Sequence, residues 1–169
     1  MKALEPEFSR PIEVSRIPIA GSVEWIAADA RECEAVARRL GLPAIAAIEA
    51  DLVLSRWRGE GIKVMGRFAA EVEQVCVVTL DPFRARVSEP IERYFLPSAR
   101  GADLEADIDP LENGVIDLGE LVVESLSLAL DPYPRKPGVE FRDPDLETRA
   151  EDRSASPFAA LGRRKGSDA

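Results

Sequence analysis

The chain has 169 residues, of which 46% are hydrophobic, and this is enough for one core of ordinary size. It contains no histidine, which removes the usual general base near neutral pH and the commonest zinc ligand. Its formal net charge of −9 is opposite to that of a protein that coats nucleic-acid backbone, so broad RNA binding is disfavoured.

The first predicted elements are an edge strand and a helix. Residues 8–19 are predicted as one extended strand, and two prolines confine it to the margin of a sheet. Asp29 and Glu32 form a capping-box pattern before apolar residues at helical spacing, which predicts a helix from Ala30 to Leu40. No apolar run is long enough to span a membrane and no secretory signal is recognised, so we expect a cytosolic protein.

Alternating sequence after this helix predicts an antiparallel meander of about four strands. Apolar residues recur at every second position over residues 48–54, and a turn with two glycines leads to a return strand over 62–68. Residues 72–80 are predicted as a further, central strand. Cys76 on this strand is interpreted as a small buried hydrophobe, because Thr79 stands where a redox CxxC pair needs its second thiol.

The strand that follows Asp81 and Pro82 carries two candidate binding residues. Arg84 and Arg86 alternate with apolar side chains and are predicted to project from one face. Such a pair either forms salt bridges on an edge strand or contacts a partner or RNA, and both interpretations stay open.

An acidic segment separates the meander from the second predicted helix. Residues 101–134 contain nine acids and no lysine or arginine, and the rest of the chain has equal numbers of acids and bases. A calcium loop starting at Asp103 fails, because Ile108 stands where its glycine belongs and Gly114 where its bidentate glutamate belongs. We therefore expect a solvated acidic loop, with an electrostatic partner surface as the alternative.

The second helix is predicted to start at Asp117 as its cap, with Glu120 closing a capping box, and to run to about Leu130. Asp131 before Pro132 ends it. Its buried stripe is expected to consist of Leu118, Leu121, Val122, Leu126 and Ala129. These elements predict an α+β fold over residues 1–141, an antiparallel β-meander of about four or five strands packed by two helices.

Residues 142–169 are predicted to form a flexible tail, because this part is charged and has no apolar period. Near its end Ser156 and Pro157 suit the start of a short helix that presents two apolar side chains, with three bases after them. The expected partner-binding residues of this motif are Phe158, Leu161, Arg163, Arg164 and Lys165. A fold-back onto the chain's own domain and an idle terminus are the alternatives.

Three ordered pieces carry a family resemblance. They are residues 74–83 (QVCVVTLDPF), 116–126 (IDLGELVVESL) and 130–134 (LDPYP), and the terminal PFAAL at 157–161 agrees with them. Together they resemble the YceD family, the large ribosomal RNA subunit accumulation proteins. Many members carry a CxxC-Leu motif, and here Thr79 replaces its second cysteine, so a metal or redox role of that pair does not transfer.

The resemblance spans roughly residues 8–165 and implies a role in synthesis, processing or stability of large-subunit (23S) ribosomal RNA. It implies no catalytic residue, cofactor or metal. With the acidic balance, it favours a non-enzymatic accessory protein that binds a protein partner in large-subunit assembly or rRNA metabolism. Direct RNA binding through Arg84, Arg86 and the tail bases is the alternative. A hydrolase using Asp107 and Asp109 is disfavoured, because neighbouring loop acids do not provide separate acid and base roles.

Overall fold

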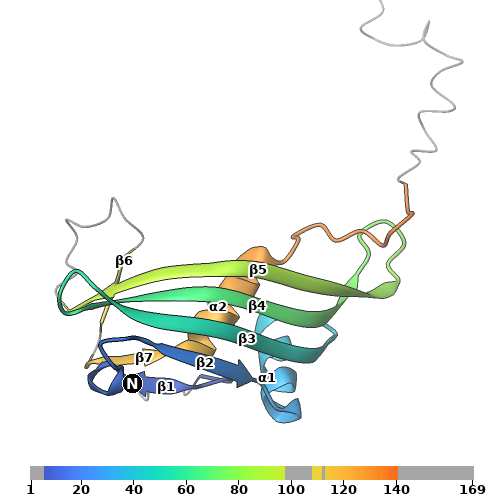
Figure 1. Ribbon diagram of the computed structural model, residues 1–169. Helices are drawn as coiled ribbons and strands as arrows, with labels where there is room; N and C mark the ends of the chain where they lie inside the picture. Colours follow the sequence, from blue (N-terminus) through green and yellow to red (C-terminus); the bar gives the residue numbers. More distant parts are fainter. Residues whose placement is uncertain (1–5, 98–107, 112, 141–169) are drawn as a thin grey trace, which may run out of the picture. The chain divides into compact units, whose positions relative to one another are not determined.

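The computed structural model describes residues 6–97, 108–111 and 113–140 (Figure 1). The chain divides into two units, Met1–Lys136 and Pro137–Ala169, and in the second unit only residues 137–140 are described. Within the described part of the first unit, a five-stranded sheet, a two-stranded sheet and two α-helices form an α+β fold. The predicted fold class is therefore confirmed.

Three long strands form the centre of the larger sheet. β3 (Ala44–Trp57), β4 (Gly61–Val75) and β5 (Pro82–Leu96) pair antiparallel in chain order. β2 (Ser22–Ala27) pairs antiparallel with β3, and β6 (Ile108–Pro110) pairs parallel with β5. The order is β2-β3-β4-β5-β6, so β2 forms one edge of the sheet.

The prediction of one strand over residues 8–19 is wrong. The segment contains β1 (Pro11–Glu13) followed by the 3-10 helix η1 (Val14–Arg16). β1 pairs with β7 (Val115–Asp117), and the N–H of Val14 then donates to the carbonyl of Gly114 at 2.9 Å. The strand ends here because β7 provides hydrogen-bond partners for the backbone only as far as Val14.

The prediction of a separate strand over residues 72–80 is also wrong. β4 is one continuous strand that ends at Val75, and the chain turns back before β5. Inside the turn the N–H of Leu80 donates to the carbonyl of Cys76 at 2.8 Å, and the N–H of Cys76 donates to that of Asp81 at 2.9 Å. Leu80 has a positive φ of 61°, which cannot be predicted from the sequence because leucine rarely adopts this conformation.

Both predicted helices are present. α1 (Ala30–Leu40) has the expected capping box of Asp29 and Glu32. α2 (Leu118–Ala129) begins after its cap Asp117, which accepts two backbone N–H bonds. The expected box at this second cap is wrong, because the Glu120 carboxylate instead pairs with an arginine of α1, Arg39, at 2.6 Å.

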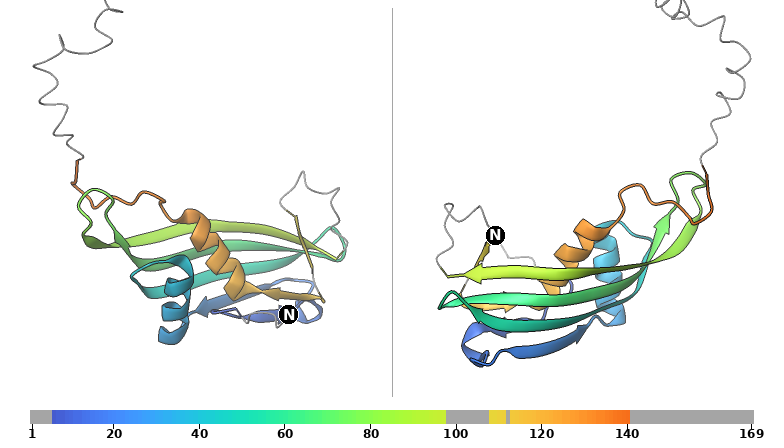
Figure 2. Two further views of the ribbon diagram at one scale, coloured as in Figure 1. Left: turned by 180° about the vertical axis from the view of Figure 1, so that it is seen from behind. Right: turned by 45° about the horizontal axis from the view of Figure 1, so that its top comes forward.

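Both helices cover the same face of the five-stranded sheet (Figure 2). The helices, the inner face of the sheet and the segments around β1 and β7 share one hydrophobic core. The expected stripe of α2 is buried except for Ala129, which is partly buried, and Val123 joins it. Neither helix covers the opposite face of the sheet.

The N-terminal segment is bound to the start of α2 through Asp117. Its carboxylate accepts the backbone N–H of Arg10 at 2.7 Å and the hydroxyl of Ser9 at 2.5 Å, in addition to capping the helix. The Arg10 guanidinium makes two bonds to Glu32 at 2.6 and 2.9 Å. This guanidinium holds the pKa of the Glu32 carboxyl below its usual value.

Candidate functional site

The face of the larger sheet that points away from the helices is the candidate site, and we call it the open face. Successive side chains of a strand point to opposite faces of the sheet. The buried residues of β2, β3, β4 and β5 stand opposite one another on the face toward the helices, so the residues between them lie on the open face. The main side chains of the open face are Val23, Trp25, Glu49, Asp51, Val53, Lys63, Met65, Arg67, Glu71, Glu73, Arg84, Arg86 and Glu92.

Four large apolar side chains gather on the open face near the β2 edge, and we call them the apolar cluster. Val23 on β2 stands opposite Val53 on β3, and Val53 stands opposite Met65 on β4. Trp25 lies two residues further along β2. Their exposed fractions are 75% for Val23, 65% for Trp25, 47% for Val53 and 43% for Met65. Exposed apolar side chains that gather in this way make this part of the open face a candidate interaction surface.

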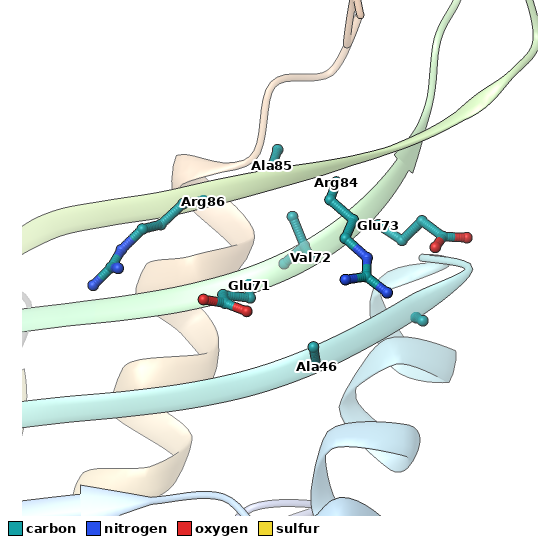
Figure 3. A pocket seen from close by; sticks show the side chains of 8 residues that line it. Ala46, Glu71, Val72, Glu73, Arg84, Ala85 and Arg86 are labelled. Atoms are coloured by element: carbon teal, nitrogen blue, oxygen red, sulfur yellow. The ribbon is translucent and has the colours of Figure 1, made fainter.

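The other part of the open face holds a charged pocket of about 310 Å³ (Figure 3). A β-bulge creates its floor, because the pairing with β4 shifts between Ile45 and Ala47 and leaves Ala46 as an extra residue. The small side chains on β3 leave space beside the long ones of β4 and β5. The pocket is lined by Ala44, Ala46, Glu71, Val72, Glu73, Arg84, Ala85 and Arg86.

The arginines of this pocket face acids across the strand pair. Arg84 stands opposite Glu73, and Arg86 stands opposite Glu71. Arg86 also approaches Glu49 of β3, with a distance of 3.9 Å between guanidinium and carboxylate. Acids on neighbouring strands lower the positive potential around these arginines and so reduce their attraction for a phosphate backbone.

Arg84 and Arg86 are thus the two predicted binding residues that the structure describes, and they lie on one face as expected. The remaining predicted residues, Phe158, Leu161, Arg163, Arg164 and Lys165, lie outside the described residues. Sequence reasoning missed the apolar cluster and the opposing glutamates. The β-branched and aromatic residues of the segment VEWIA at 23–27 were an available signal for β2, whereas the positions of the opposing glutamates follow only from the strand register.

A second group of chemical interest is Cys76, which is buried in the turn between β4 and β5. The prediction of a buried thiol is correct, but its place on a central strand is wrong. The backbone N–H of Lys136, followed by the hydroxyl and N–H of Thr79, lowers the pKa of Cys76 to about 7, against the opposing effect of burial. Burial raises the pKa of the other thiol, Cys33.

We expect the stability of the protein to rise with pH through the titration of Cys76. Its pKa is about 7 when folded and 9.0 in its ordinary state, so the thiolate is favoured by folding. The contribution is complete above the ordinary pKa and is lost as pH falls through about 7. Urea unfolding between these two pH values measures it. Cys76→Ser should flatten the rise and Cys33→Ala should keep it, whereas equal slopes in all three proteins would contradict the assignment.

Within residues 6–97, 108–111 and 113–140, no group of three or more cysteines and acids is placed to hold a metal ion. None of the described helices has the length and apolar character needed to cross a membrane.

A comparison with family models relates the sequence to known proteins. The model described as "Large ribosomal RNA subunit accumulation protein YceD" matches residues 64–163. This range includes most of β4, the Cys76 turn, β5 and α2, whereas β2 and β3 precede it. No curated protein and no solved structure matches the chain. The match covers more than half of the chain, and the chain belongs to the YceD family, whose name implies a role in accumulation of large-subunit ribosomal RNA.

Proposed function

We propose that the chain is a cytosolic, non-enzymatic accessory protein that supports large-subunit (23S) rRNA by binding a protein partner through its open face. The apolar cluster carries this proposal. Val23, Trp25, Val53 and Met65 are exposed together on a sheet face that the helices do not cover. Burial of such a group against a partner supplies the apolar centre that protein interfaces have.

The charges of the open face support a protein partner over direct RNA contact. Glu73 and Glu71 stand opposite the two arginines of the pocket, and the chain as a whole carries a charge of −9. A phosphate-binding surface needs uncompensated bases, because its affinity comes from release of counterions. Direct RNA binding through Arg84 and Arg86 is therefore the second candidate.

We also propose that the terminal motif with Phe158 and Leu161 is a tethered anchor for the same partner. A helix of this length gains order only on contact, and the bases at 163–165 would stabilise its C-terminal end. An anchor on a linker raises the effective concentration of the open face at the partner, so two modest contacts act together.

Complementation of cells that lack the chain tests this function. Val53→Lys with Met65→Lys places charge in the apolar cluster, and deletion of residues 156–169 removes the anchor. We expect both variants to leave large-subunit rRNA at the level of the deficient cells. The matched surface variant, Arg84→Ala with Arg86→Ala, should restore it to the wild-type level.

The reverse pattern would support the RNA-binding candidate. In that case purified wild-type protein should bind structured large-subunit rRNA at low salt and lose affinity steeply at moderate salt. The thermal midpoints of all variants must equal that of the wild type for the comparison to hold. Normal rRNA in cells that lack the chain would overturn the proposed function itself.

A further inference from the structure

We propose that the outer edge of β2 binds an extended, lysine- or arginine-bearing segment of the partner, which adds to the sheet as a further strand. This inference rests on the proposed function and specifies the form of its partner. Three features of the edge support it: the direction of its backbone groups; the absence of a bulge, proline or lysine; and its charge.

The backbone direction follows from the pairing of β2 with β3. The N–H of Ala28 donates to the carbonyl of Ile48 at 3.0 Å, just beyond the last registered pair, Ala27 with Glu49. Hydrogen-bonded residues alternate along an antiparallel strand. The N–H and C=O groups of Val23 and Trp25 therefore point away from β3.

A hydrogen bond on the outer side of β2 agrees with this alternation. Nη2 of Arg10 donates to the carbonyl of Ala27 at 2.9 Å, and Ala27 belongs to the same outward set. In the described part of the chain, the sheet ends at β2, and no strand pairs with the outward groups of Val23 and Trp25. Such a row of alternating donors and acceptors matches an extended polypeptide.

The β2 edge has neither a bulge nor a proline or lysine against pairing, and its one charged side chain is Glu24. Its register with β3 is uninterrupted over its whole sequence SVEWIA, from Ser22 to Ala27. The opposite edge differs. In the described part of the chain, β6 covers β5 only at residues 94–96, and the rest of that edge is β5 itself, which contains Pro82 and Pro90. Of the two edges, β2 is the one suited to strand addition, and Val23 and Trp25 would contact the side chains of the added strand.

The charge near the β2 edge selects a basic segment. Glu24 lies on β2 between Val23 and Trp25 and projects on the face toward the helices. On the open face, Asp51 stands beside Trp25 and opposite Arg67 of β4, and Glu49 stands beside Ala27 with Arg86 at 3.9 Å, so these two acids already face bases. A second copy of the chain would bring the same acids toward those of the first copy, which disfavours two-fold pairing. A strand that alternates apolar and basic residues would place its apolar side chains beside Val23 and Trp25 on the open face. Its basic side chains would then lie on the other face, beside Glu24.

The first test uses a capped peptide of alternating lysine and valine, with a glutamate–valine peptide of equal length as control. Amide hydrogen exchange of the whole chain is followed by NMR. Saturating lysine–valine peptide should slow exchange at Val23 and Trp25 about tenfold or more. The glutamate–valine peptide should change neither rate. Binding without protection of these two amides, or no binding, would overturn the inference.

The second test removes the outward donor. Val23→Pro deletes an N–H that the β2–β3 ladder does not use, so the fold should persist with an unchanged thermal midpoint. Affinity for the lysine–valine peptide should fall about tenfold or more. Leu128→Ala, which changes an exposed side chain of α2 outside the open face, should retain the affinity of the wild type. Equal affinity in Val23→Pro and wild type would contradict strand addition.

The two proposals can fail separately. If Val23→Pro restores large-subunit rRNA in cells that lack the chain, the strand-addition inference fails while the proposed function stands. If the free wild-type protein already shows protection of Val23 and Trp25 that increases with protein concentration, a second copy occupies the edge, and the basic-segment inference is wrong. If cells without the chain have normal rRNA, the function fails whatever the peptide does.

Discussion

Leu121→Asp is expected to unfold the first unit. Leu121 is buried on α2 and belongs to the core shared by both helices and the larger sheet. The substitution removes roughly 1.5–3 kcal/mol of apolar burial and places a carboxylate in a dry site at a further cost of several kcal/mol. Since whole domains are stable by only about 5–15 kcal/mol, little or no folded protein should remain. Circular dichroism and the thermal midpoint measure this.

The same helix offers a matched control in Leu128, which is 79% exposed. Leu128→Asp makes the same chemical change on the outer side of α2, so its thermal midpoint should stay close to that of the wild type. An unchanged midpoint in Leu121→Asp, or an equal loss in both variants, would show that α2 does not pack as described.

Asp117→Ala is expected to cost roughly 2–4 kcal/mol, which combines a lost helix cap with an unsatisfied donor at the N-terminal segment. The Asp117 carboxylate accepts the N–H groups of Gly119 and Glu120 at the start of α2, and it also accepts from Ser9 and from the N–H of Arg10. Urea unfolding gives the free energy directly.

Asp29 provides the comparison, because it caps α1 at an exposed position and, among the described residues, accepts only from the N–H groups of Arg31 and Glu32. Asp29→Ala should cost about 1 kcal/mol. If the two variants lose equal stability, Asp117 acts as an ordinary cap and its bonds to Ser9 and Arg10 contribute nothing.

Both helices could be predicted from the sequence because their signals are local. In each helix the capping residue, Asp29 or Asp117, is followed within a few residues by the apolar positions at helical spacing. The box expected at Asp117 failed for a non-local reason. The Glu120 side chain has a better partner in Arg39, and that arginine is distant in sequence.

The strands show where local pattern is insufficient. Alternation continues through Val75 and Val77, so the end of β4 depends on the turn geometry and on the positive φ of Leu80, which leucine rarely adopts. β2 was missed because Val23 and Trp25 on the open face are apolar like the buried Ile26 on the other face.

The candidate site was predictable only in part. The shared face of Arg84 and Arg86 follows from strand alternation. Their opposition to Glu73 and Glu71 depends on how two strands align, and the pocket floor depends on the bulge at Ala46. Neither alignment nor bulge position is encoded in a short stretch of sequence.

The pairing of β1 with β7 has a consequence for how the chain is made. Ser9 bonds to a residue 108 positions later, so the N-terminal segment must wait for Asp117 and α2 before it can find its place. Contacts of such long sequence separation slow folding. During translation Phe8 and the part of the sheet's inner face that α2 covers therefore remain exposed until α2 has left the ribosome.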